Sequence, residues 1–299
     1  MTQNAGFGAY TPEFTFFMDG GTSSRAESKE SVVRCIDGVA ENALSFSPDF
    51  VLFQEIDFGS TRSYQVEERK QLVKAFAEGY KNVFAVNYHS AYLMYPITEP
   101  HGKSQSGILT FSKINITSAL RRSLPISTGV SKLVDLDRCY SVSRIPVENG
   151  KELLLYNVHL SAYGNSDEIR AGQMSMLFDD MVAEYEKGNY CVCGGDFNHD
   201  FTGNSSDMFN GSGQGNFSWA QPFPEEMLPE EILRCVDYTA GADIPSCRNC
   251  DLPVSEGPGL FIVDGFLVTK NVSISRLENI DASFEYSDHN PVVMTFSLQ

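Results

Sequence analysis

The chain has 299 residues, with 39 acidic and 22 basic side chains that give a formal net charge of −17. Hydrophobic residues make up 42% and charged residues 20%, a balance that supports a large core and excludes a disordered chain. No run approaches the roughly 20 apolar residues that a membrane span needs. The acidic balance disfavours extended nucleic acid as a partner, because phosphate backbones are bound by clustered Lys and Arg.

The cysteines and the N-terminus indicate a reducing compartment. An odd number of cysteines cannot all pair within one chain, which argues against a disulfide framework. The seven are Cys35, Cys139, Cys191, Cys193, Cys235, Cys247 and Cys250. Cys247 and Cys250 form a lone CxxC without a second Cys or His pair at zinc spacing, so we expect ordinary thiols rather than zinc or a redox pair. No signal peptide is visible, which predicts a cytoplasmic chain. A chain from which an export signal or anchor had been removed would show the same features.

In the first half of the chain, helices and strands are expected to alternate. An amphipathic helix is predicted over residues 24–45, and Ser47-Pro48-Asp49 breaks it. The fully apolar run 50–53 then ends at Gln54-Glu55, which is typical of a buried strand with a carboxylate at its tip. Further predictions are a helix at 66–78 and strands at 82–88 and 107–111.

The second half predicts a hairpin, a long helix and more strands. Segments 139–147 and 151–159 flank Asn149-Gly150, both of which tolerate positive φ in a tight turn. A helix at 167–187 should stop at Gly188. Strands are expected at 190–194, 260–269, 272–277 and 291–298. The irregular stretch 198–258 is long for a loop, so we expect it to hold short helices and shape a site.

Polar residues stand where several apolar strands end. The fragments are Thr2-Gln3-Asn4-Ala5-Gly6, Phe53-Gln54-Glu55, Asn157-Val158-His159-Leu160, Gly194-Gly195-Asp196-Phe197-Asn198 and Ser287-Asp288-His289-Asn290-Pro291. Asp264 lies inside a further apolar strand. Each of these residues alone also has a non-catalytic explanation, such as a surface acid, a satisfied histidine, a turn residue or the partner of an Arg. Buried carboxylates are costly unless they are paired or bind a cation. To exclude a shared site, all of the non-catalytic explanations would have to be true at once.

Taken in order, these motifs resemble the endonuclease/exonuclease/phosphatase superfamily of metal-dependent phosphoesterases. It includes deoxyribonuclease I, exonuclease III, neutral sphingomyelinases and inositol polyphosphate 5-phosphatases. The resemblance runs from Asn4 to Asn290, and Gly-Asp-Phe-Asn combined with the terminal Ser-Asp-His-Asn-Pro is its most specific part. Lesser matches are Ser106-Gly107-Ile108-Leu109, Arg138 and Arg170-x-x-Gln173. The resemblance implies an α/β fold, a four-layered α/β/β/α sandwich of two mainly antiparallel sheets, as one domain over residues 1–299.

The resemblance also implies roles for the strand-end residues. Glu55 would be the principal ligand of Mg²⁺, or of Mn²⁺ in its place, with Asn4 and Asp288 nearby; hard oxygen donors suit such ions. Asp196 would orient or deprotonate the attacking water, and Asn198 would help to hold the phosphate. His289, oriented by Asp264, would contact the scissile phosphate, and His159 would donate to a phosphoryl oxygen.

Two further residues are candidates for substrate binding. Arg248 precedes the strand of Asp264, where it would bind phosphate or pair with an acid. Tyr163 follows His159 as a wall residue or an exposed loop tyrosine. Gly6 stands where some nucleases of the superfamily carry an acid, and residues 16–21 are an insertion that either lines the site or plugs the core.

The scattered basic residues favour a small or lipid-linked phosphoester, diester or monoester, as the substrate. We expect a monomer. The alternative is a DNA endonuclease or exonuclease of the deoxyribonuclease I or abasic-site type. A non-catalytic binding module on the same fold would lack a catalytic residue, and no motif position is missing here.

Overall fold

The computed structural model describes residues 1–126, 137–162, 167–210 and 219–299, and its strands form two large sheets and one small one. The first sheet contains β1 (Thr2–Asn4), β2 (Phe50–Asp57), β3 (Lys81–Leu93), β4 (Gly102–Ser112), β13 (Val272–Asn279) and β14 (Val292–Leu298). The second contains β5 (Ser118–Ser123), β6 (Cys139–Pro146), β7 (Glu152–His159), β8 (Tyr190–Asp196), β9 (Ile232–Arg234) and β12 (Asp264–Thr269). The small sheet pairs β10 (Cys247–Arg248) with β11 (Leu260–Phe261).

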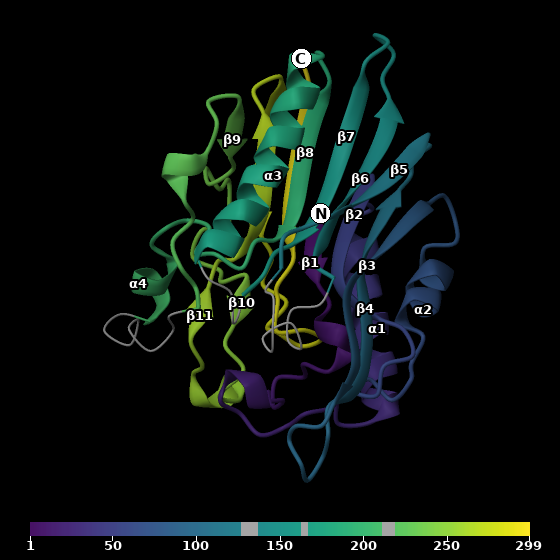
Figure 1. Cartoon of the computed structure of the whole chain (residues 1–299), viewed down its shortest axis with the longest axis vertical. Helices are drawn as coiled ribbons and strands as arrows, with labels where there is room; N and C mark the ends of the chain where they lie inside the picture. The colour runs from purple at the N-terminus through teal and green to yellow at the C-terminus, as the bar shows by residue number, and fades with distance from the viewer. Residues whose placement is uncertain (127–136, 163–166, 211–218) are drawn as a thin grey trace.

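The helices are α1 (Lys29–Ser45), α2 (Glu68–Ala75), α3 (Asp167–Glu186) and α4 (Ser205–Asn210), with short 3-10 helices that include Gly6–Gly8 and Phe17–Asp19. The strand orders are β13-β14-β1-β2-β4-β3 and β5-β6-β7-β8-β12-β9. In these two sheets the neighbours are antiparallel except for β1 with β2 and β7 with β8. Two mainly antiparallel sheets flanked by helices (Figure 1) confirm the predicted α/β sandwich.

Three apolar layers hold these elements together. α1 and α2 cover the outer face of the first sheet, where Ile36 of α1 and Phe53 of β2 belong to one buried cluster. α3 lies over the outer face of the second sheet (Figure 1), with Met181 and Cys193 in a second cluster. The third cluster fills the space between the sheets and includes Leu52, Val192, Phe266 and Val292. The run 50–53 is apolar throughout because β2 buries both of its faces.

The element boundaries follow local chemistry. The first helix begins at Lys29, later than predicted, because the Ser28 hydroxyl accepts the Ser31 N–H at 3.0 Å and caps it. In the described part of the stretch 198–258 (198–210 and 219–258), the elements are α4, two 3-10 helices, β9 and β10, which confirms the short helices predicted there. None of the helices in the described parts of the chain combines the length and apolar character needed to cross a bilayer.

Candidate active site

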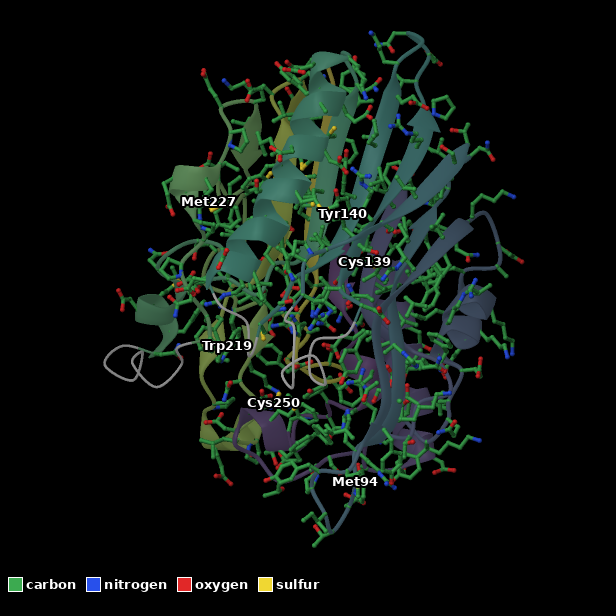
Figure 2. All side chains as sticks on the ribbon, viewed as in Figure 1. Met94, Cys139, Tyr140, Trp219, Met227 and Cys250 are labelled. Carbon is green, nitrogen blue, oxygen red and sulfur yellow. The ribbon has the colours of Figure 1, made fainter. Side chains whose placement is uncertain are left out.

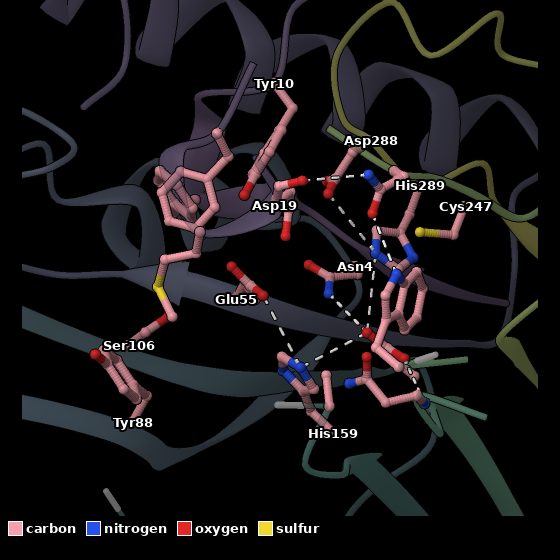
Figure 3. A pocket seen from close by; sticks show the side chains of 18 of the residues that line it. Asn4, Tyr10, Asp19, Glu55, Tyr88, Ser106, His159, Cys247, Asp288 and His289 are labelled. Carbon is pink, nitrogen blue, oxygen red and sulfur yellow. Dashed lines mark hydrogen bonds and ion pairs between the residues drawn. The ribbon is translucent and has the colours of Figure 1, made fainter. Parts of the chain in front are cut away.

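Strand register gathers the predicted residues at one end of the two sheets. β8 lies between β7 and β12, and His159 and Asp264 are both register partners of Asp196. In the first sheet, Asn4 at the end of β1 pairs with Gln54, next to Glu55. Figure 3 shows Asn4, Glu55, His159, Asp288 and His289 pointing into one space.

A segment near the start of the chain and the segment that precedes β14 meet at this site. The Ser287 hydroxyl donates to the Asn4 carbonyl at 2.8 Å, and the Gln3 amide donates to the His289 carbonyl at 3.1 Å. β1 also pairs with β14 through Thr2 and Val292. Asn4 and His289 are therefore held in one frame, although they are distant in sequence.

A β-bulge aims Glu55 into the pocket. The pairing of β2 with β4 shifts register between Phe53 and Ile56, and Glu55 has a φ of 55°, a left-handed conformation that costs a non-glycine residue energy. Its Oε1 lies 3.9 Å from His159 Nε2, and its Oε2 lies 3.9 Å from Arg62 Nη2. Burial raises the pKa of the Glu55 carboxyl.

Asp196 is the central carboxyl group of the site. Its Oδ2 accepts the Asn4 side-chain amide at 3.0 Å, and its Oδ1 accepts the Asn198 main-chain N–H at 2.9 Å. Oδ2 also lies 3.6 Å from His159 Nε2 and 3.9 Å from His289 Nε2. Burial, reinforced by the neighbouring Asp264 carboxylate, raises the pKa of Asp196 to about 7. The group can therefore take up or release a proton near neutral pH.

The two histidines carry different charges. Burial opposes protonation of His289, but Asp264, whose Oδ2 accepts His289 Nδ1 at 2.7 Å, raises its pKa well above the ordinary value. The Ser246 hydroxyl donates to the same Asp264 oxygen at 2.8 Å. Burial, followed by the charge of Arg138, lowers the pKa of His159 well below its ordinary value. His289 is thus a cation at neutral pH, and His159 is neutral.

Asn198 shapes the loop after β8. Its side-chain amide donates to the Leu160 carbonyl at 2.8 Å, and its φ is 52°, a conformation that asparagine tolerates better than most residues. Gly195 has a φ of 154°, and the close packing of β8 against β7 requires a glycine there. A Cβ would lie 2.0 Å from the Val158 carbonyl oxygen.

The side chains enclose a pocket that has room for a phosphate. Its lining combines acids (Asp19, Glu55, Asp196 and Asp288) with guanidinium groups (Arg62, Arg138 and Arg248) and aromatic rings (Phe7, Tyr10, Phe16, Tyr88 and Trp219). The space measures about 120 Å³. One water occupies roughly 10–15 Å³ by this measure, so several water-sized groups fit.

The structure places the two predicted substrate-binding residues differently. Arg248 borders the pocket, but its Nη2 donates to the Thr11 and Phe14 carbonyls, each at 3.0 Å, and its Nη1 donates to Leu252 O at 3.2 Å. These bonds tie the N-terminal segment to the loop after β10. Tyr163 lies outside the described residues.

Arg62 is the main lining residue that the sequence did not single out. Its guanidinium donates to both Asp57 carboxylate oxygens at 2.9 Å and lies 3.8 Å from the centre of the Phe7 ring. It comes from a polar loop with no periodic pattern, and the only hint in the sequence is an acid five residues before it. Asn87 and His101 also line the pocket without such a signal.

The insertion at residues 16–21 serves both of its predicted roles. Phe16, Met18 and Asp19 line the pocket, and Phe16 also belongs to the buried cluster under α1. The seven cysteines are free thiols. Cys247 lines the pocket, where burial raises its pKa to about 12, and the Cys250 thiol donates to Asp288 Oδ2 at 3.7 Å.

Two sets of donors could hold a metal ion. Among the described His, Cys, Asp and Glu side chains, Asp196, Asp264 and His289 bring ligand atoms within 4.8 Å of one another, but His289 Nδ1 and Asp264 already bond to each other. Asn4, Glu55 and Asp288 offer amide and carboxylate oxygens. Burial raises the pKa of both the Glu55 and Asp288 carboxyls, and a cation between them would offset that cost.

Known proteins share this fold. The model of the Endonuclease/Exonuclease/phosphatase family matches residues 1–289. No curated protein matches the sequence. An endonuclease/exonuclease/phosphatase from Beutenbergia cavernae DSM 12333 is 18% identical with a TM-score of 0.59, covering 88% of this chain and 66% of its own. The corresponding protein from Bacteroides vulgatus is 15% identical with a TM-score of 0.57, covering 100% of this chain and 97% of its own.

D. rerio TDP2, solved with a single-strand DNA product, is 15% identical with a TM-score of 0.54 and covers 88% of this chain and 91% of its own. At these identities the three structures establish a shared fold. The family match over nearly the whole chain goes further: the protein belongs to the endonuclease/exonuclease/phosphatase family, whose members are generally metal-dependent hydrolases of phosphoester bonds.

Proposed function

We propose that this protein is a Mg²⁺-dependent phosphoesterase that hydrolyses a phosphodiester, or a phosphomonoester, of a small or lipid-linked substrate. One observation carries the proposal: Asp196, a carboxyl group with a pKa of about 7, lies between a neutral and a charged histidine in a single pocket. A general base works best when its pKa is close to the operating pH.

Each catalytic residue then has a chemical task. Asp196 accepts the proton of the attacking water while Asn4 and the Asn198 N–H hold its two oxygens in place. His159, neutral and protonated on Nε2, donates to a phosphoryl oxygen. His289, kept charged by Asp264, contacts the scissile phosphate and stabilises the charge that develops in the transition state.

The metal would be held by Glu55, Asn4 and Asp288. Their oxygen donors suit Mg²⁺, and the same donors suit Mn²⁺. When bound, the ion supplies positive charge next to the phosphate oxygens. The remaining positive charge comes from the protein itself, since Arg62 and Arg138 line the pocket.

The assignment of phosphate contact differs from the one that the sequence suggested. The Nη atoms of Arg248 donate to main-chain carbonyls, so we assign it the positioning of the pocket wall. Arg62 is likewise held by Asp57, and we assign phosphate contact mainly to Arg138, with Arg62 beside it in the lining. Asn198 remains a candidate phosphate ligand beside them, and Tyr163 remains a candidate wall residue.

The size of the pocket and the net charge of the protein favour some classes of substrate over others. A pocket of about 120 Å³ in a protein of net charge −17 suits one phosphoester group better than an extended polyanion. The second candidate is a DNA endonuclease or exonuclease. It is favoured by Trp219 in the pocket lining, where an indole can stack on a base, and by the fold shared with TDP2. A non-catalytic module is disfavoured, because all of the described catalytic candidates line one pocket or support it.

The test is a hydrolysis panel with purified protein and Mg²⁺ or Mn²⁺. Substrates are bis(p-nitrophenyl) phosphate, p-nitrophenyl phosphate, sphingomyelin, phosphoinositides, single-stranded DNA, plasmid and an abasic duplex. We expect turnover of a small or lipid phosphoester that EDTA abolishes, that Asp196→Asn removes, and that Asp179→Asn on the exposed side of α3 retains. No turnover of any substrate would refute the proposal. Plasmid nicking alone, at physiological salt, would replace it with the DNA endonuclease.

A further inference from the structure

The hairpin of β3 and β4 ends in an exposed apolar tip. The apolar tip consists of Tyr92, Met94, Tyr95 and Ile97, with exposed fractions of 55%, 74%, 61% and 87%. Of the twelve large hydrophobic side chains that are exposed in the described parts of the chain, these four lie within six residues. Figure 2 shows Met94 where the hairpin projects beyond the body of the molecule.

The size and charge of the apolar tip indicate what it contacts. Residues 91–98 contain no charged side chain, on a chain whose net charge is −17. The tip offers four such side chains, whereas a standard protein interface takes roughly 20–30 residues from each partner. A narrow projection with two tyrosines fits the interface of a bilayer, where aromatic side chains are enriched.

The apolar tip is continuous with the wall of the pocket. Tyr88 of β3 and Ser106 of β4 are register partners, and both line the pocket. The same two strands run on to the tip. There, the Tyr95 ring lies 5.6 Å from the Phe17 ring, and the next residue, Met18, lines the pocket.

We propose that the apolar tip docks the protein on a zwitterionic phospholipid surface and presents the pocket to phosphoester headgroups. Met94 follows the last residue of β3 and lies six residues after Tyr88, a reach on the order of 20 Å. A tip inserted by about 5–10 Å, as interfacial segments are, therefore holds the pocket close to the headgroups. The docking is inferred from the exposed side chains alone, whereas the identity of the substrate as a lipid depends on the proposed phosphoesterase function.

Vesicle binding tests the docking. Sedimentation with phosphatidylcholine vesicles is measured for the wild type, for Met94→Ser/Ile97→Ser and for Leu120→Ser. The control, Leu120, is a 56% exposed apolar residue on β5. We expect the wild type and the control to bind and the tip variant to bind at least tenfold more weakly. Adding phosphatidylserine should weaken wild-type binding, because the chain is acidic. Failure of the wild type to bind, or equal binding by the tip variant, would overturn the docking.

Further measurements separate docking from catalysis and from self-association. Asp196→Asn should bind phosphatidylcholine vesicles like the wild type, so vesicle binding without any hydrolysis would leave docking intact and refute the phosphoesterase. The tip variant should lose at least tenfold in turnover of a vesicle substrate while keeping its turnover of bis(p-nitrophenyl) phosphate. Loss of both activities equally would overturn the link between tip and substrate. A wild-type dimer that Met94→Ser/Ile97→Ser converts to a monomer would assign the tip to a second copy of the chain instead.

Discussion

Asp264 Oδ2 lies 2.7 Å from His289 Nδ1, and this contact keeps His289 charged. The neutral His159 lies on the same Asp196 oxygen as His289, at 3.6 Å against 3.9 Å. One side chain therefore sets the charge of a histidine that lines the pocket. The pair is buried, so water screens it little.

Replacing Asp264 by Asn should change the pH dependence of the reaction. Without the carboxylate, the pKa of His289 falls, so the imidazolium is lost as the pH rises through the new value. We expect kcat to drop by about 10²–10³-fold and a new decline in rate toward higher pH. A pH profile of kcat measures this. A uniform loss of rate with an unchanged profile would contradict the role given to the pair.

Glu55→Gln should weaken metal binding more than it weakens folding. The substitution keeps the shape of the side chain and removes its charge, so we expect the Mg²⁺ concentration for half-maximal activity to rise by at least about tenfold. Titration of activity with Mg²⁺ measures this. Glu67→Gln, before α2 and with 45% of its side chain exposed, is the matched control and should leave the titration unchanged. An unchanged midpoint for Glu55→Gln would assign the metal elsewhere.

Gly6→Ala should cost more stability than a left-handed conformation alone explains. A Cβ at Gly6 would lie 2.5 Å from Tyr10 Cδ2 and 2.7 Å from Asp288 Oδ1. Gly150 also has a positive φ, but a Cβ there meets nothing within 4 Å, so Gly150→Ala reports the backbone cost, about 1 kcal/mol. Urea unfolding should show a larger loss for Gly6→Ala, by about 1–3 kcal/mol, together with reduced activity. Equal losses would show that Tyr10 and Asp288 can move aside.

The imidazole of His101 should make the protein less stable in mild acid. Burial lowers the pKa of His101 to about 4, and its Nδ1 contacts the Ser24 carbonyl at 2.6 Å. The unfolded chain, with an ordinary histidine pKa of about 6.5, then binds more protons than the folded one. Stability is therefore full above pH 6.5 and falls as the pH drops toward 4, by up to about 3 kcal/mol.

Urea midpoints between pH 7 and pH 4 measure the His101 effect. The variant His101→Gln should unfold more easily at pH 7, because it loses the buried ring, but should show a flatter pH dependence in this window. The same slope in the variant and the wild type would assign the acid sensitivity to other groups.

Much of the fold and of the site could be predicted from the sequence, because short-range signals mark them. The Asn149-Gly150 turn marked the hairpin of β6 and β7, and the polar ends of β2, β7 and β8 marked the pocket. Asp196 and His159 meet because β7 and β8 are parallel neighbours, and two strands that end together place their last side chains together.

What the sequence did not reveal depends on long-range packing. Arg62 was not singled out because its position depends on Asp57 and the Phe7 ring, both of which are fixed only in the folded sheet. The Nη donors of Arg248 meet the carbonyls of Thr11 and Phe14, more than 200 residues away, and no local pattern records such a contact. β5 and β9 were not predicted either, because β5 is a polar, largely exposed edge strand and β9 has three residues.

The hydrogen bonds that Gln3 and Ser287 make across the site join residues that are synthesised early to residues that are synthesised late. They therefore affect when the site can form during synthesis. Asn4 leaves the ribosome early, but the residues that frame it, Ser287 and His289, leave late. Contacts of such separation form last, since they close the longest loops. During most of synthesis β1 has no β14 to pair with. A nascent chain that stops short of residue 287 also lacks Asp288 and His289, two residues of the pocket lining.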